Sequence, residues 1–277
     1  MQKNLSTNHK LIKTITKWPL SKVALIKIDS EKYIKKTVHK DFKQEYDLQK
    51  FLYHNLVGVK VPKVYGLELS GNLASFLMEN IDSDSKVTDK EALELLFEFQ
   101  NQPKKIADKS FTVYDFTAFE RDVATAAIYG VDLKAEDYKE IFDEENIIVH
   151  GDFGRDQIIK DKNGEFYLID FAKSFTGPSI LDTAYFCRKD LALENMSLEL
   201  YKYDSKHLLR AKIVVGVMQI SWYHLCQTKY IKDHDYVGKE IKDEKSTWVW
   251  IFGRYKTRKG CDSYFQGDCD GRRTCGT

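Results

Sequence analysis

The 277-residue chain has little of what marks several specialised classes of protein. Only 4 prolines and 15 glycines occur, which excludes a collagen-like or proline-rich linker sequence. Its 43 basic and 42 acidic residues leave a net charge of +1, so bulk charge does not indicate a nucleic-acid partner. Five cysteines, an odd number without paired spacing, do not make a disulfide framework, and we expect a reducing compartment, the cytoplasm.

Long apolar runs are also missing from the sequence. A membrane-spanning helix needs about 20 mostly apolar residues. The best stretch, residues 213–220, is soon followed by Ser221 and His224. The first ten residues, MQKNLSTNHK, have no apolar segment of the kind found in signal peptides. The sequence therefore predicts no membrane partner, and nothing in it specifies an oligomeric state.

The end of the chain differs in composition from the rest. The segment GCDSYFQGDCDGRRTCGT is rich in Gly, Asp, Arg and Cys and has almost no apolar period. We therefore expect residues 246–277 to form an atypical, disordered tail. The gaps between Cys261, Cys269 and Cys275 lack the CxxC spacing of structural zinc sites, so no metal is predicted there.

Residues 1–82 have the patterning of a small β-rich unit. The runs KLIKTIT, KVALIKID and EKYIKKTV are β-type segments separated by turn residues, and KVYGLEL and LASFLMENI are two more around residues 70–72. A helix is expected between the two groups, beginning at Asp41 with Gln44 in capping-box position. This order predicts an N-terminal lobe made of an antiparallel sheet and one helix.

From Thr88 onward the apolar residues recur with helical spacing. Thr88 and Glu91 have the spacing of a second capping box. Helical patterns fill residues 115–145 and 181–231, and a mixed island, NIIVHGDFGRDQIIKDKNGEFYLIDF, lies between them. We expect a mainly helical C-terminal lobe over residues 83–245, and hence a bilobal α+β fold.

Two aspartates in the island lie at the ends of β-type runs. Asp152 follows IIVHG, Asp170 ends FYLID, and Gln157 lies between them. Strands fix the direction of such side chains while the adjoining loops expose them. One carboxylate there can orient a hydroxyl group or accept its proton. A second can hold magnesium on a triphosphate, with an amide oxygen as a further ligand.

The island also resembles a known family. HGDFGRDQII is similar to the HGDxxxxN catalytic loop of the aminoglycoside phosphotransferase and choline kinase superfamily, and LIDF to its metal-binding segment. The resemblance implies a protein-kinase-like fold and an enzyme that uses ATP and Mg2+ to phosphorylate a hydroxyl group of a small molecule: an aminoglycoside, a choline-like amino alcohol or a sugar. Asp152 would be the catalytic aspartate, with Asp170 and Gln157 as metal ligands. Gln157 replaces the family's Asn, and Asp182 would be its buried structural aspartate.

The resemblance further implies a strand lysine that binds phosphates and pairs with a glutamate of the next helix. Alternation along KYIKKTV places Ile34, Lys36 and Val38 on one face of the strand. Lys36, between two apolar neighbours on the face toward the core, is therefore chosen over Lys35. Glu45, near the start of the following helix, is the glutamate candidate.

FLMENI resembles the hinge of the family, where backbone groups meet adenine. Glu79, Asn80 and Ile81 would supply these groups, with Met78 beside the pocket. The turn KWPLSK, in contrast, has no glycine where protein kinases have a glycine-rich loop.

Two other functions stay open. An atypical protein kinase would share the HGD and IDF segments, although the helical region between Asp89 and Glu145 is long for one. A nucleotide-binding pseudokinase, acting as a binding module, is favoured by Gln157 and by the turn without glycine. For an enzyme, ten acidic and eleven basic residues within 180–245 do not indicate a polycationic acceptor.

Overall fold

The structure of the protein is a computed structural model that describes residues 9–18, 20–102, 111–231 and 242. The expected tail, residues 246–277, lies outside the described residues, as do Cys261, Cys269 and Cys275. The strands are β1 (Lys10–Trp18), β2 (Ser21–Ile28), β3 (Glu31–His39), β4 (Val64–Ser70), β5 (Leu73–Glu79), β6 (Ser83–Ser85), β7 (Asn146–Val149), β8 (Ile158–Asp161), β9 (Phe166–Leu168) and β10 (Phe175–Pro178). The α-helices are α1 (Gln44–Asn55), α2 (Asp89–Gln100), α3 (Phe116–Ala127), α4 (Ile180–Phe186), α5 (Leu191–Tyr201) and α6 (Ser205–Leu225).

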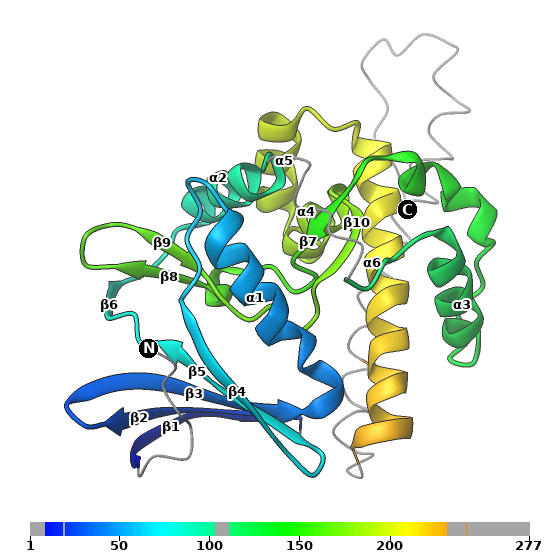
Figure 1. The fold of residues 1–277 in the computed structure, drawn as a ribbon. Coiled ribbons are helices and arrows are strands. Elements are labelled where there is room, and N and C mark those ends of the chain that lie inside the picture. Colours follow the sequence, from blue (N-terminus) through cyan, green and yellow to red (C-terminus); the bar gives the residue numbers. More distant parts are fainter. Residues whose placement is uncertain (1–8, 19, 103–110, 232–241, 243–277) are drawn as a thin grey trace, which may run out of the picture.

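The first five strands form one antiparallel sheet in the order β1-β2-β3-β5-β4. Helix α1 lies between this sheet and the helical part of the molecule (Figure 1). One side of α1 supplies Leu48 and Leu52 to an apolar cluster that also contains Leu96 of α2 and Phe153 and Phe171 of the island. The helix therefore joins the sheet to the segment with the candidate catalytic residues. An α+β fold with a sheet and one helix in the N-terminal part is confirmed.

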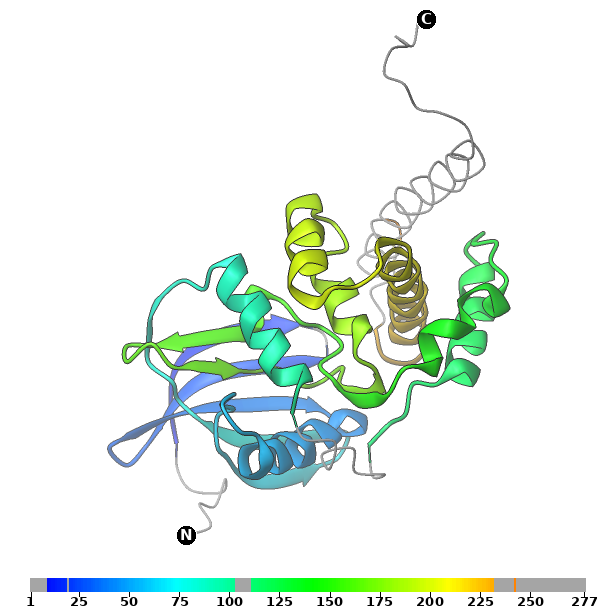
Figure 2. The same ribbon diagram turned by 90° about the horizontal axis from the view of Figure 1, so that it is seen from above.

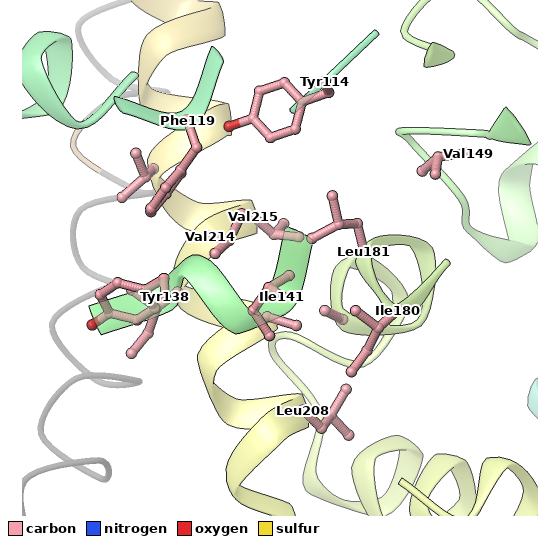
Figure 3. Packing of buried hydrophobic residues seen from close by; sticks show 14 of the residues in the cluster. Tyr114, Phe119, Tyr138, Ile141, Val149, Ile180, Leu181, Leu208, Val214 and Val215 are labelled. Carbon is pink, nitrogen blue, oxygen red and sulfur yellow. The ribbon is translucent and has the colours of Figure 1, made fainter. Parts of the chain in front are cut away.

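The C-terminal part is built around α6. Helix α6 runs through it beside α3 and α4 (Figures 1 and 2). Its residues Ile213, Val214, Val217 and Ile220 are completely buried, so α6 is apolar around most of its circumference. Figure 3 shows the core that forms around it, with side chains from α3, α4 and the turn of residues 135–143.

Short strands connect the two parts. Strand β6 pairs with β8, and β8 forms a hairpin with β9. Strand β7 pairs with β10 in a separate two-stranded sheet. These small sheets carry the ends of β7 and β9, which lead to Asp152 and Asp170, and Asp170 reaches Lys36 of β3 in the N-terminal sheet. The boundary between residues 82 and 83 stays a prediction.

Two local expectations differ from the structure. The first helix begins at Gln44 without a side-chain cap, and Asp41 lies in a preceding 3-10 turn, η1 (Lys40–Phe42). Asp41 does not cap α1 because its carboxylate accepts hydrogen bonds from Lys229 and Tyr230 of the π-turn η5 (Cys226–Tyr230). The expected helix at residues 136–145 is instead a 3-10 segment, η3 (Ala135–Asp143).

The three-residue period of η3 matches its buried side chains. Tyr138 and Ile141, three positions apart, both point into the core. In contrast, the capping box of Thr88 and Glu91 is present at the start of α2, with both of its hydrogen bonds. Within the described ranges, no helix has both the length and the apolar character needed to cross a membrane.

Candidate active site

A buried carboxylate accepts hydrogen bonds from the backbone of the loop that follows β7. Asp182 of α4 is fully buried and accepts hydrogen bonds from the backbone N–H groups of His150 (2.7 Å) and Gly151 (2.9 Å). Burial raises the pKa of Asp182 to about 6, against the effect of His150 and the two N–H groups. Asp182 is therefore buried among helices, as expected of a structural aspartate. Its two hydrogen bonds fix the direction of the loop that leads to Asp152.

The segment after Asp170 is locked to the same loop. His150 is buried, its Nε2 lies 2.8 Å from the carbonyl oxygen of Ile169, and Ser174 Oγ donates to the His150 carbonyl (2.9 Å). Gly151 has a φ of +79°, and a Cβ there would lie 2.2 Å from the carbonyl oxygen of Lys173. Only glycine fits at this contact. The approach fixes Lys173 next to the aspartate loop.

Two carboxylates from different parts of the chain meet at the ammonium group of Lys36. The Lys36 ammonium lies 2.5 Å from Glu45 Oε1 and 2.7 Å from Asp170 Oδ1. The Lys36 side chain is 4% exposed and that of Glu45 is 0% exposed, whereas that of Asp170 is 42% exposed. The lysine comes from β3, the glutamate from α1, and the aspartate follows β9. The structure therefore brings together residues that are 9 and 134 positions from Lys36 in the chain.

The charges in this cluster stabilise one another. Desolvation lowers the pKa of Lys36, but Glu45 and Asp170 outweigh it and the pKa is raised. Desolvation raises the pKa of Glu45 to about 7 although the ammonium opposes it. For Asp170 desolvation is the largest single effect and raises the pKa, but the charge and hydrogen bond of Lys36, together with His150 and Lys173, outweigh it, and the pKa is lowered. Asp170 is therefore an ionised carboxylate, although its backbone φ of +64° is one that non-glycine residues rarely adopt.

Both carboxylate oxygens of Asp152 contact a polar side chain. The hydroxyl group of Tyr185, on α4, donates to Oδ1, and the ammonium of Lys173 lies 3.2 Å from Oδ2. Neither partner was predicted from the sequence. Lys173 offered a signal, because it lies three residues after Asp170 in a segment already singled out. Tyr185 offered none, since nothing in its local sequence marks it among 16 tyrosines.

Two cavities adjoin Asp152. The first, of about 280 Å³, is lined by Lys36, Asp170 and Lys173 and by apolar side chains of both lobes. These apolar residues include Trp18, Leu20, Val38, Phe42, Trp222 and Tyr223. The second, of about 490 Å³, is lined by the loop 153–157, by α4 and by the residues that follow it. Among the described residues, only Asp152 lines both cavities.

The remaining predicted residues do not line the first cavity. Met78 packs in an apolar cluster with Val64 and Phe76, and the backbone N–H of Glu79 donates to the carbonyl of Lys63 (2.8 Å). Asn80 donates to Asp82, and Ile81 is half-buried in the connection to β6. The adenine-binding role of residues 78–81 stays a prediction.

Gln157 is linked to the segment of Asp170 by its backbone, and its side chain points elsewhere. Its carbonyl accepts from the N–H of Ile169 (2.9 Å), but its side-chain amide donates to Asp156 (3.0 Å) and lines the second cavity. In the described part of the chain, no three His, Cys, Asp or Glu side chains are grouped as a metal cage. The ionised carboxylate of Asp170 fits Mg2+, which usually takes only one or two protein ligands beside substrate phosphates, whereas the Gln157 amide lines the other cavity.

Comparison with known proteins gives similarity of structure but not of sequence. A scan against protein-family models and a search of curated proteins returned no match. Aminoglycoside phosphotransferase APH(4)-Ia is similar with a TM-score of 0.63 at 13% identity, over 88% of this chain and 93% of that chain. Choline kinase LicA from Streptococcus pneumoniae gives a TM-score of 0.60 at 15% identity, over 87% and 91% of the two chains.

A third similar structure is a thermostable mutant of APH(4)-Ia in a ternary complex with AMP-PNP and hygromycin B. It has a TM-score of 0.64 at 14% identity, over 89% of this chain and 95% of that chain. At such identities the likeness concerns the fold. The chain has the same bilobal, kinase-like fold as these phosphotransferase and choline kinase structures, and the fold that the resemblance of the island predicted is confirmed.

Proposed function

We propose that the protein transfers the γ-phosphoryl group of ATP to a hydroxyl group of a small molecule. The observation that carries this proposal is the meeting of Lys36, Glu45 and Asp170 beside Asp152 at one cavity. A buried lysine that pairs with a helix glutamate is the arrangement that holds nucleotide phosphates in kinase folds. The structural neighbours agree with it, since they include a choline kinase and an aminoglycoside phosphotransferase bound to AMP-PNP.

The chain's own residues divide the chemistry between them. Lys36 holds the phosphates, and Glu45 keeps its ammonium in place. Asp152 orients the acceptor hydroxyl and accepts its proton as the acceptor oxygen bonds to the γ-phosphorus. The bond from phosphorus to the bridging oxygen then breaks, and this oxygen leaves on ADP. Because little covalent chemistry falls to the protein, positioning and charge account for most of the rate.

The first cavity offers magnesium the carboxylate of Asp170. Asp170 would hold the ion, with Gln157 as a further ligand once its amide turns from Asp156. When bound, Mg2+ neutralises charge on the β- and γ-phosphates. Lys173 brings a further positive charge to the same place, since its ammonium contacts Asp152 and lines the first cavity.

The test separates binding from transfer. Purified protein is incubated with MgATP and panels of aminoglycosides, choline, amino sugars and casein, and ADP formation is followed. We expect turnover with a small molecule, and Asp152→Asn to lower it about 100-fold or more. The rise in melting temperature with MgATP should be nearly unchanged in this variant, because Lys36 and Asp170, and not Asp152, are assigned to the phosphates and their metal. Asp132→Asn, at an exposed position, is the control. Full activity of Asp152→Asn would refute the assignment of the catalytic loop.

A second candidate is a nucleotide-binding protein without transferase activity. The hydrogen bond between the Gln157 amide and Asp156 favours it, because this amide lines a different cavity from Asp170. The same assay distinguishes the two. Stabilisation by MgATP without turnover on any panel, and without recovery in Gln157→Asn, supports this binding module. Turnover of casein alone supports a protein kinase.

A further inference from the structure

We infer that the acceptor is an uncharged polyhydroxylated molecule, a carbohydrate or polyol, bound in the second cavity. This inference rests on the proposed function and names the acceptor class for the same site. A residue that aligns an acceptor hydroxyl on a phosphoryl donor must touch the sites of both. Among the described residues Asp152 alone lines both cavities, and the phosphate-binding candidates Lys36 and Asp170 lie on the first. The second cavity is therefore the place for the acceptor.

The volume and lining of the two cavities agree with this division. The first, about 280 Å³, must take phosphates, and the ammonium of Lys173 lies 5.8 Å from the centre of the Trp222 ring. That aromatic face is thus already covered by a cation, which disfavours a quaternary ammonium acceptor there. The second cavity, about 490 Å³, lies in the size range of small-molecule sites.

The wall of the second cavity presents hydrogen-bond donors and acceptors in balance. Its charged side chains are the carboxylates of Asp152 and Asp156 and the guanidinium groups of Arg155 and Arg188. Hydroxyl groups both donate and accept, so a polyol matches such a mixed wall. A polycation would find no excess of negative charge on this wall, because the two guanidinium groups offset the two carboxylates.

The residues that line the second cavity also contact Asp152 and one another. Tyr185 donates to Asp152, and the Arg188 guanidinium lies 3.7 Å from the centre of the Tyr185 ring while its Nη1 donates to the Tyr185 carbonyl (2.8 Å). Arg155 is held from the other side by Asp89, at 3.0 Å. The donors are therefore positioned before a ligand arrives, and Tyr185 is a positioning residue for Asp152.

The experiment compares acceptors that differ in charge, each with MgATP. Glucose, fructose, ribose and inositol are the uncharged set, and kanamycin and choline the cationic set; ADP formation is measured. We expect turnover in the uncharged set. Arg188→Ala and Arg155→Ala should each raise KM for that acceptor about tenfold, with KM for MgATP unchanged. Tyr185→Phe should lower kcat with little change in the acceptor KM. Arg121→Ala, on the exposed face of α3, is the matched control.

Each other outcome overturns the inference in a recognisable way. Turnover of kanamycin or choline but of no uncharged compound refutes the acceptor class and leaves the phosphotransferase intact. Unchanged acceptor KM in both arginine variants shows that the second cavity is not the acceptor site. If no compound is phosphorylated although MgATP raises the melting temperature, the proposed function fails together with the inference.

Discussion

Replacing Lys36 by Met isolates the buried charge cluster on which the proposed nucleotide site depends. The substitution keeps an unbranched side chain of similar length but removes the ammonium from Glu45, which is 0% exposed. Breaking a buried ion pair by removing one partner typically costs about 3–5 kcal/mol, because the remaining charge stays desolvated. We expect a loss in that range at pH 8.

The loss should depend on pH with a definite sign. The pKa of Glu45 is already raised to about 7, and without the ammonium it rises further. A carboxyl group whose folded pKa exceeds its unfolded pKa binds a proton on folding. Its destabilising effect therefore grows as pH rises from the unfolded pKa through the folded one. The difference between wild type and Lys36→Met should widen above pH 7 and narrow below it, where Glu45 becomes neutral.

Urea unfolding at pH 6 and pH 8.5 measures this effect. The double variant Lys36→Met/Glu45→Gln lacks the unpaired carboxylate and should recover at least about half of the loss, as coupled neighbours do. Lys35→Met is the matched control, since the neighbouring lysine lies on the opposite face of β3. It should change the free energy of unfolding by about 0.5 kcal/mol or less. A loss for Lys36→Met no larger than that of Lys35→Met would refute the buried pair.

Three further predictions concern the metal, the amide and the structural aspartate. ATP should raise the melting temperature more with Mg2+ than with EDTA, and Asp170→Ala should abolish this difference. A difference equal to that of wild type would exclude Asp170 as the metal ligand. Gln157→Asn should keep or increase ADP formation, whereas a tenfold loss would show that the longer amide has a role that Asn cannot fill. For Asp182, a folded pKa of about 6 against 3.8 makes the native state bind a proton in this window, so this group lowers stability by about 2 kcal/mol from pH 4 to pH 6. Denaturant unfolding should show a steeper fall between these pH values in wild type than in Asp182→Asn, in which only the contribution of Asp182 is lost and Glu45 still titrates.

Sequence patterns were sufficient where the structure depends on local spacing. Alternation along β3 distinguished Lys36 from Lys35, and the structure buries Lys36 against Glu45. The capping box at Thr88 rests on residues three apart and is present. The positions of Asp152 and Asp170 follow from strand ends in one short island. In these cases the determining contacts lie within a few residues, or within a known motif.

Tertiary contacts decided the features that the sequence did not predict. Asp41 was expected to cap α1, but it accepts hydrogen bonds from residues 188 and 189 positions away. Tyr185 contacts Asp152 only because α4 packs under the loop, 33 residues along the chain. Such contacts leave no periodic signal, since they depend on how whole elements pack.

The energetic costs at this site argue for a ligand. Glu45 is a fully buried carboxylate, Lys36 a buried ammonium, and Asp170 a non-glycine residue with a left-handed backbone. Well-packed apolar side chains in place of a buried ion pair are often equally stable or more so, so stability alone does not explain the pair. Strained backbone and shifted pKa values gather at sites where a ligand or a reaction uses them. All three costs here fall on residues that meet at one ammonium group, beside the only aspartate that lines both cavities in the described chain. A phosphate chain with its cation would use each of these features, and this supports the proposal that the cluster binds a nucleotide and does not serve the stability of the fold alone.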